Sequence, residues 1–363
     1  MLFDSGRGRA DAQLLDGGAA IMTVRILSLT ALCVLSSGGA AFGQDMAEMY
    51  AQGYRLDAEL KARSAPIMPS LRWQRNVTFA EALPVKEGKY TTSLALDLLH
   101  PADAAAKPRP LVLFVHGGGW ASGNRSMGEG FLPLFAGGGA VAGTLSYRLS
   151  RDAPYPAALQ DVAAAVAWIR TNAASLGVDP DRIAIWGHSA GAHLAIHTAV
   201  FDPERAEGIR CAVGVAGPYN LLLEENKSMF GEMMVRNFLR DPEDPMGTGE
   251  GAEEAIRARA REASPVNHLD RSDPPLLLIH GGKDSLCASA QARDMAVAAM
   301  DAGAEVHLGF YPEIGHVPTD PDVFRTISRF MDRHLGTSCS AFFDSIWPVE
   351  QVVAASAAQD TKE

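Results

Sequence analysis

A single serine stands between two glycines in the sequence Gly-His-Ser-Ala-Gly at residues 187–191. The apolar run Ile183 to Trp186 precedes it, and helix-compatible sequence follows from Ala192. Such glycines permit a sharp strand-to-helix turn that exposes the Ser189 hydroxyl at a helix N-terminus, where negative charge is favoured. A glycine-rich turn without any chemistry has the same pattern, so the partners of Ser189 must decide between the two interpretations.

A second glycine run, His116-Gly-Gly-Gly-Trp120, directly follows the apolar stretch Leu111 to Val115. Glycines at a strand end let backbone N–H groups point into a cleft without obstruction by side chains. A tetrahedral intermediate of acyl transfer needs such donors for its oxyanion. The alternative is an ordinary glycine-rich loop, and the sequence favours the first interpretation.

Asp284 and His316 each follow a further apolar strand, at residues 276–279 and 305–310. A serine is a weak nucleophile unless a neighbouring base takes its proton, which a neutral histidine can do near pH 7. A carboxylate then fixes the imidazole tautomer and stabilises the imidazolium. Either residue alone is more typical of a solvated turn or loop. Together with the two glycine motifs, they predict a triad of Ser189, Asp284 and His316.

Apolar strands alternate with helical patterns and short connections along the chain, for example the amphipathic helix at 155–177 that Gly177 ends. This alternation predicts an α/β fold with a doubly wound, mostly parallel sheet. Functional groups in such sheets gather at the C-terminal ends of the strands. Asp161 lies off the apolar stripe of the helix. A solvated helix acid is the favoured interpretation, and orientation of a group near the site is the alternative.

Six short motifs occur together in one order: His116-Gly-Gly-Gly-Trp120, Tyr155-Pro156 with Asp161, Gly187-His-Ser-Ala-Gly191, Ser264-Pro265, His280-Gly-Gly-Lys-Asp284 and Gly315-His316. In this order they resemble α/β-hydrolase esterases of the BD-FAE and hormone-sensitive-lipase-like group. The resemblance covers roughly residues 77–335, and it implies an α/β-hydrolase fold.

The same resemblance implies a role for each residue of the site. Ser189 corresponds to the nucleophile, His316 to the base and Asp284 to the orienting acid. The implied backbone donors of the oxyanion hole are Gly118, Gly119 and Ala190.

The chain departs from these relatives at two places. Ala192 stands where many of them have another glycine, which bears on helix packing more than on chemistry. Leu286 and Cys287 stand where relatives often have an apolar residue followed by proline. The shape of the loop after Asp284 therefore stays open.

Residues 220–262 interrupt the strand–helix alternation with Met and Phe side chains, an acidic loop and an Arg-rich helix. An insertion with adaptable apolar side chains is suited to a substrate cap. A surface excursion that packs its own small core fits equally well. The candidate substrate-binding residues are Trp120, His188, Met229, Phe230, Met233 and Met234.

The N-terminal residues 1–43 are predicted to be an upstream extension followed by a signal peptide. From Met22 the chain has a charged start at Arg25, an apolar run and a small-residue cleavage site before Gln44. The alternative is a buried N-terminal helix. We expect export to the periplasm or medium, with an N-terminal extension at 44–76, a hydrolase domain at 77–336 and a C-terminal tail at 337–363.

Composition narrows the range of partners. The net charge of −11 over 363 residues is unchanged by removal of residues 1–43, and it argues against binding to nucleic acid or anionic membranes. The remaining cysteines, Cys211, Cys287 and Cys339, allow at most one internal disulfide, and their spacing does not suit a metal or redox site. No cofactor or metal is expected, and the oligomeric state stays open.

The sequence therefore favours an exported serine carboxylesterase that hydrolyses small acyl esters, acetyl or aromatic and possibly carbohydrate-linked. A formamidase or amidase of the same fold is the main alternative. A serine peptidase is a weaker one, because no propeller-like repeat precedes the hydrolase core. A non-catalytic binding protein would be expected to lack a triad residue, and none is missing.

Overall fold

The computed structural model describes residues 39–80, 94–103, 107–222, 229–244 and 247–348. The chain divides into two compact units, Met1–Ala51 and Gln52–Glu363. Helix α1 (Gly39–Ser64) crosses this division and includes the predicted cleavage point before Gln44. The predicted signal peptide otherwise lies outside the described residues, so its cleavage stays a prediction. None of the helices in the described ranges is long and apolar enough to cross a lipid bilayer.

One eight-stranded sheet organises the second unit, with strand order β1-β2-β4-β3-β5-β6-β7-β8. β2 is antiparallel to both of its neighbours, whereas every pair from β4 to β8 is parallel. This confirms the predicted mostly parallel sheet. The strands are β1 (Leu71–Thr78), β2 (Ala95–Pro101), β3 (Arg109–Val115), β4 (Val141–Leu145), β5 (Val178–His188), β6 (Ile209–Val215), β7 (Leu276–Gly281) and β8 (Val306–Tyr311).

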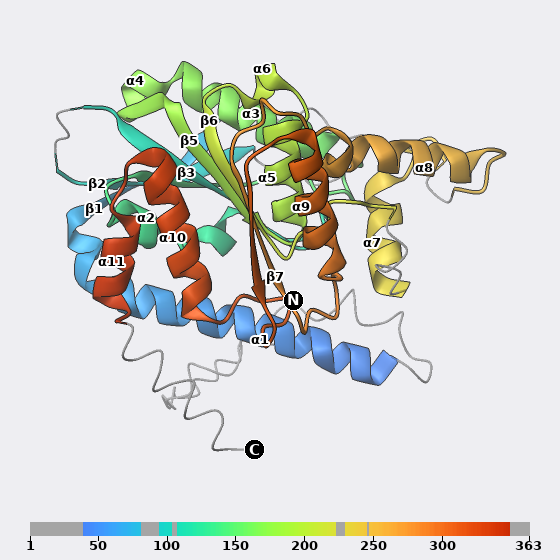
Figure 1. Ribbon diagram of the computed structural model, residues 1–363, viewed down its shortest axis with the longest axis horizontal. Helices are drawn as coiled ribbons and strands as arrows, with labels where there is room; N and C mark the ends of the chain where they lie inside the picture. The colour runs from blue at the N-terminus through green and yellow to red at the C-terminus, as the bar shows by residue number, and fades with distance from the viewer. Residues whose placement is uncertain (1–38, 81–93, 104–106, 223–228, 245–246, 349–363) are drawn as a thin grey trace, which may run out of the picture. The chain divides into compact units, whose positions relative to one another are not determined.

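Helices cover both faces of the sheet, as the doubly wound arrangement requires (Figure 1). One face carries α3 (Ala157–Thr171), α5 (Ala190–Val200) and α9 (Ala290–Ala302). The other carries α2 (Leu132–Ala136), α10 (Pro321–Leu335) and α11 (Cys339–Ile346). The shorter elements are α4 (Ala173–Leu176), α6 (Pro203–Ala206), η1 (Ala65–Ser70), η2 (Arg125–Gly128) and η4 (Pro265–Asn267).

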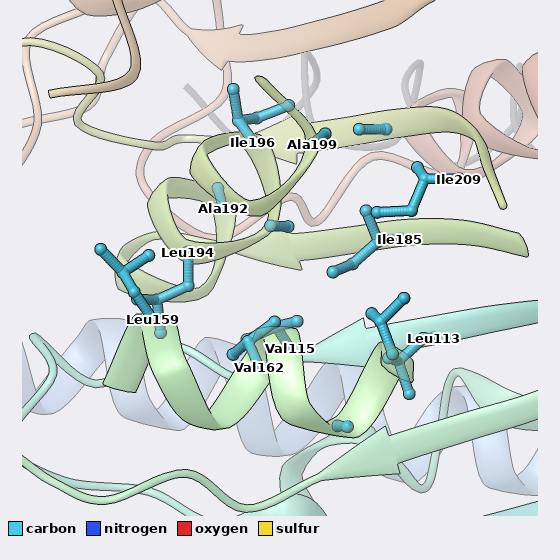
Figure 2. Close-up of a cluster of buried hydrophobic side chains, with 14 of the residues drawn as sticks. Leu113, Val115, Leu159, Val162, Ile185, Ala192, Leu194, Ile196, Ala199 and Ile209 are labelled. Atoms are coloured by element: carbon cyan, nitrogen blue, oxygen red, sulfur yellow. The ribbon is translucent and has the colours of Figure 1, made fainter. Parts of the chain in front are cut away.

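The central strands are apolar without interruption because both of their faces are covered. Figure 2 shows Val115 of β3 and Ile185 of β5 on the face where Val162 of α3 also lies. Phe114 and Trp186, the residues next to them in these strands, lie with their ring centroids 4.5 Å apart. Trp186 also contacts two further aromatic rings, Phe131 just before α2 and Phe135 within α2. Burial on both faces fixes the register of β3 and β5, which carry the two glycine motifs.

The sheet and its covering helices extend beyond the predicted domain. β1 begins at Leu71, inside the segment expected to be an N-terminal extension, and α11 forms in the segment expected to be a tail. Phe343 of α11 is fully buried. Residues 71–76 and 339–346 therefore belong to the same sheet and helix layers as the predicted 77–336 domain.

Asp161 corrects a prediction, because it is buried rather than solvated. Its carboxylate accepts hydrogen bonds from the Arg148 backbone N–H (2.7 Å) and guanidinium (2.7 Å from Nη2). A buried carboxylate requires such a partner. The partner lies in the loop after β4, which helical periodicity does not reveal.

The three cysteines of the hydrolase unit are free buried thiols, so no disulfide joins Cys211, Cys287 and Cys339. Burial raises the pKa of the Cys211 and Cys339 thiols to about 12. These side chains therefore act as small apolar residues of the core.

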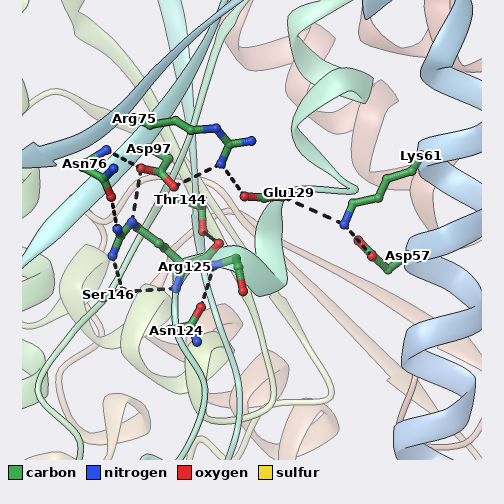
Figure 3. Close-up of polar contacts among 11 residues, drawn as sticks. Asp57, Lys61, Arg75, Asn76, Asp97, Asn124, Arg125, Glu129, Thr144 and Ser146 are labelled. Carbon is green, nitrogen blue, oxygen red and sulfur yellow. Dashed lines mark hydrogen bonds and ion pairs between the residues drawn. The ribbon is translucent and has the colours of Figure 1, made fainter. Parts of the chain in front are cut away.

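A buried carboxylate also holds the segment that follows the glycine motif at residues 116–120. Asp97 of β2 lies between Arg125 of η2 (3.2 Å) and Arg75 of β1 (3.6 Å), as Figure 3 shows. Arg75 pairs in addition with Glu129, next to the end of η2. The network joins β1, β2 and η2, so the outer strands help to anchor the loop that leaves β3.

Candidate active site

Ser189 lies between the end of β5 and the start of α5, in a strained backbone conformation with φ 56° and ψ −124°. Non-glycine residues rarely adopt this region, and such strain costs about 1–3 kcal/mol. The Ser189 N–H donates to the Val215 carbonyl of β6 at 2.8 Å. This bond and the start of α5 hold the turn in place. The sharp strand-to-helix turn predicted from the sequence is thus confirmed.

The two glycines of this motif are required by close backbone contacts. A methyl group at Gly191 would approach the Val115 carbonyl oxygen to 2.0 Å, and one at Gly187 would approach the Gly191 carbonyl oxygen to 2.3 Å. Neither distance is possible for a real side chain. The end of β3 therefore touches the turn after β5 directly, which places the two motifs side by side.

The glycine loop after β3 runs along this turn. A methyl group at Gly117 would come within 3.2 Å of Ser189 Cβ. Gly118 and Gly119 have positive φ angles of 109° and 58°. No hydrogen bond described for this part of the chain uses their N–H groups. Ala190 is the first residue of α5, where N–H groups lack partners within the helix.

Trp120 closes this loop and is buried, with 3% of its surface exposed. Its indole N–H donates to His193 Nδ1 at 3.2 Å, and its ring stacks on Phe238 at 4.5 Å between centroids. The structure thus places the Trp120 side chain against His193 and Phe238. Its contact with substrate stays a prediction.

His316 follows β8 in the loop that begins after Tyr311, and its Nδ1 lies 2.8 Å from Asp284 Oδ2. The predicted acid and base are therefore hydrogen-bonded. Asp284 follows β7, and its side chain is fully buried. A methyl group at Gly281 would lie 2.2 Å from the Ile314 carbonyl oxygen. This close contact brings the two loops together.

Four N–H groups lie around the Asp284 carboxylate. Oδ1 accepts from the N–H groups of Leu286 and Cys287 at 2.9 Å each. Oδ2 contacts His316 Nδ1 and also His280 Nε2 at 3.2 Å, and His280 Nε2 shares its one proton with the Cys287 carbonyl oxygen at 2.9 Å. Burial alone would raise the pKa of this carboxyl. The nearby His316 and the hydrogen bonds from His280 and His316 outweigh burial, so the pKa of Asp284 lies well below its usual range.

The structure also settles the shape of the loop after Asp284. The resemblance implied a departure at Leu286 and Cys287, where a proline was expected. In this chain the Cys287 N–H donates to the Asp284 carboxylate, a bond that a proline, which has no N–H, could not make.

His188, the residue before Ser189, reaches across to the other loop. Its Nε2 lies 2.7 Å from the His316 carbonyl oxygen, and the two rings lie 4.9 Å apart. Burial first, and the neighbouring His316 second, lower the pKa of His188 to about 4. A neutral His188 therefore donates to the backbone of His316 and links the turn of Ser189 to the loop of the base.

The predicted cap forms two helices, α7 (Met229–Leu239) and α8 (Ala252–Ala263), which lie together in Figure 1. Met233 is 53% exposed. A methyl group at Gly119 would touch Met234 Sδ at 2.4 Å, so α7 packs against the glycine loop. The side chains of Met229 and Phe230 lie outside the described part of the structure, and their role stays a prediction.

Two residues near the site were not predicted from the sequence. His280 contacts the acid, and His193 contacts Trp120. Each lies four residues from a predicted catalytic residue, His280 before Asp284 and His193 after Ser189. The four-residue spacing could have drawn attention to both histidines. It does not show which groups they contact, because the turns that bring those groups together are not visible in the sequence.

The arrangement has the parts that acyl transfer needs. A strained serine lies against a loop with available N–H groups, and a histidine is held by a buried carboxylate kept ionised by its donors. The described residues place all of them at the C-terminal ends of β3, β5, β7 and β8, as expected for a parallel sheet.

Comparison with known proteins places these motifs in a family context. The family model BD-FAE matches residues 96–298, which is more than half of the chain. The chain is 29% identical to Esterase LipQ of Mycobacterium tuberculosis over 276 residues, which is 73% of this chain and 63% of that protein. It is 30% identical to Esterase LipC of the same organism over 275 residues, 70% of this chain and 63% of that protein. The chain thus spans less than two thirds of these relatives.

Solved structures give the same arrangement of elements. A truncated carbohydrate esterase from gut microbiota aligns with TM-score 0.59 and 22% identity, over 73% of this chain and 96% of that one. An esterase of Thermogutta terrifontis with butyrate bound aligns with TM-score 0.52 and 26% identity, over 69% of this chain and 85% of that one. The first of these likenesses concerns the fold alone.

We predict that the protein loses stability as the pH falls from about 6.5 to about 4. Burial is the main factor that lowers the pKa of His100, His116, His188 and His193 to about 4. In the unfolded chain these groups take up protons near pH 6.5. Between the two values the unfolded state binds more protons than the folded state. The contribution of these histidines to the free energy of unfolding is therefore complete above pH 6.5 and decreases as the pH falls toward 4.

Urea unfolding at pH 5 and pH 7.5, at equal ionic strength, measures this slope. Each histidine contributes about 1.4 kcal/mol per pKa unit at most. His100→Gln, which keeps a donor toward Gln74, should reduce the slope. Equal free energies of unfolding at the two pH values would contradict the prediction.

Proposed function

The chain belongs to the BD-FAE family and has the α/β-hydrolase fold, and we propose that it is a serine carboxylesterase acting on small acyl esters. The observation that carries the proposal is the hydrogen bond between His316 and the buried carboxylate of Asp284. The loop of His316 also accepts a hydrogen bond from His188, the residue before Ser189. The names of the relatives, which are esterases, agree with it.

The proposed reaction begins with attack of Ser189 Oγ on the ester carbonyl carbon while His316 Nε2 takes the hydroxyl proton. The N–H groups of Gly118, Gly119 and Ala190 stabilise the oxyanion of the tetrahedral intermediate. The intermediate collapses as His316 returns the proton to the leaving alkoxide, which leaves an acyl-enzyme on Ser189.

A water molecule then hydrolyses the acyl-enzyme, with water as the nucleophile and Ser189 as the leaving group. His316 takes a proton from water as the water oxygen attacks the acyl carbonyl. It then returns this proton to Ser189 Oγ, which leaves as the acid product is released. Asp284 stays ionised throughout, because its donors stabilise the carboxylate rather than the acid. Its function is to fix the His316 tautomer and stabilise the imidazolium.

Ser189→Ala and His316→Ala should each lower kcat for nitrophenyl acetate by about 10⁴-fold or more, because nucleophile and base act as one unit. In the parent protein, activity should rise with pH to a plateau, because only a neutral base can accept the Ser189 proton. The measurement is steady-state hydrolysis, with circular dichroism to verify folding.

Ser175→Ala and His307→Ala are matched controls, since both residues lie away from the motifs and bond locally. They should keep the parent's activity. A folded His316→Ala protein with most of its turnover would refute the assignment. Acetylated xylan, feruloyl esters and nitroanilides in the same panel would separate carbohydrate esterase, aromatic esterase and amidase activities.

The cap is proposed to set the acyl or alcohol preference. Met229, Phe230, Met233 and Met234 belong to a helix that packs on the glycine loop. Loss of one methylene-scale contact changes discrimination by about 1–3 kcal/mol. Phe230→Ala and Met233→Ala should therefore shift the chain-length preference in kcat/KM and leave acetate hydrolysis nearly unchanged.

Met300→Ala is the control for this series, because Met300 is a 60% exposed methionine on α9. It should not alter the chain-length profile. Unchanged profiles for both cap variants would mean that specificity is set elsewhere, for example near Trp120 or within residues 44–75.

We also propose that the protein is exported through the segment that begins at Met22. Expressed with this segment, it should be recovered from the periplasm or medium with Gln44, or a residue within a few positions, at its N-terminus. Mass spectrometry of the secreted and cytosolic fractions measures this. An intact chain from Met1 in the cytosol would contradict the proposal.

A further inference from the structure

His193 makes two hydrogen bonds in opposite directions from the first turn of α5. Its Nδ1 accepts the Trp120 indole N–H at 3.2 Å, and its Nε2 lies 2.7 Å from the Ala263 carbonyl oxygen at the end of α8. An acceptor at Nδ1 and a donor at Nε2 define one neutral tautomer. The ring is fully buried, so neither bond competes with solvent.

Trp120 links this histidine to the glycine loop. It directly follows Gly119, and its own backbone is held by the Ser150 N–H, which donates to the Trp120 carbonyl at 2.7 Å. Trp120 itself has a positive φ of 57°, which is unfavourable for a residue of this size. The contacts of the indole therefore have to hold the loop in this conformation.

The cap helices supply the remaining contacts of this link. Phe238 of α7 stacks on Trp120 with an interplanar angle of 12° and meets His193 edge-on at 5.6 Å. Met234, one turn earlier, lies against Gly119. Both cap helices thus touch either the glycine loop or the histidine behind it.

We propose that His193 is a positioning residue that couples the docked cap to the oxyanion-hole loop through Trp120. When α8 is in place, the Ala263 carbonyl fixes the His193 ring, and the ring fixes the indole that ends the glycine loop. The N–H groups of Gly118 and Gly119 are then held in the orientation that the oxyanion needs. This inference rests on the proposed esterase function.

Three substitutions separate the two bonds. Trp120→Phe removes the indole N–H and keeps a ring against Phe238. His193→Gln can still reach the Ala263 carbonyl with its Nε2 but loses the acceptor for Trp120. His193→Asn keeps an acceptor near the Nδ1 position and loses the donor to Ala263.

Each variant should lower kcat for nitrophenyl acetate by about tenfold, with KM within about twofold of the parent. This is less than the 10²–10³-fold loss when an oxyanion donor is deleted, because the donors are displaced and not removed. A boronic acid that mimics the tetrahedral intermediate should lose affinity in parallel with kcat. The double variant Trp120→Phe with His193→Gln should have the same kcat as the less active of the two single variants, because both substitutions delete the same hydrogen bond.

His197→Asn is the matched control, because His197 lies one turn further along α5 and bonds the Glu262 carbonyl of the same helix end at 3.2 Å. It removes one other contact with the end of α8, leaves both hydrogen bonds of His193 in place and should keep kcat. Parent-like kcat in Trp120→Phe and His193→Gln would overturn the inference, as would an equal loss in His197→Asn. If His193→Gln does not fold, Trp120→Phe decides alone. Failure of the esterase proposal itself would be seen separately, as a parent protein whose hydrolysis does not depend on Ser189.

Discussion

The direct backbone contact between the end of β3 and the turn after β5 is the constraint on which the site depends. At Gly191 even a methyl group would meet the Val115 carbonyl oxygen at 2.0 Å. This approach places the glycine loop beside Ser189, since a methyl group at Gly117 would lie 3.2 Å from Ser189 Cβ. The approach requires a glycine at 191, and the turn itself requires one at 187. The strain in Ser189 is offset by the buried strands on either side, whose register is fixed by burial of both sheet faces.

Most of the fold and the candidate site could be predicted from the sequence, because local patterns of residues determine the strands, the helix ends and the glycine motifs. Uninterrupted apolar strands, helix terminators such as Gly177 and the glycine motifs need only local information. Gly177 indeed adopts a left-handed conformation with φ 65° at the end of α4. The pairing of Asp284 with His316 followed from strand ends meeting at one edge of a parallel sheet.

Elements whose burial is decided by distant partners could not be predicted in the same way. β1 has an irregular burial pattern, so no alternation marks it as a strand. Asp161 reads as a surface acid until Arg148 is known to reach it from the loop after β4. His280 and His193 likewise gain a meaning only when the turns bring Asp284 and Trp120 within reach.

Histidines with opposite requirements surround this site. His316 has to gain and lose a proton, and it is held against a carboxylate with four donors. His188 and His193 instead serve as fixed neutral groups, since burial lowers the pKa of each to about 4. A protonated His193 could not accept the indole N–H of Trp120. Burial therefore allows two neighbouring imidazoles to act as rigid supports at the pH where a third one transfers protons.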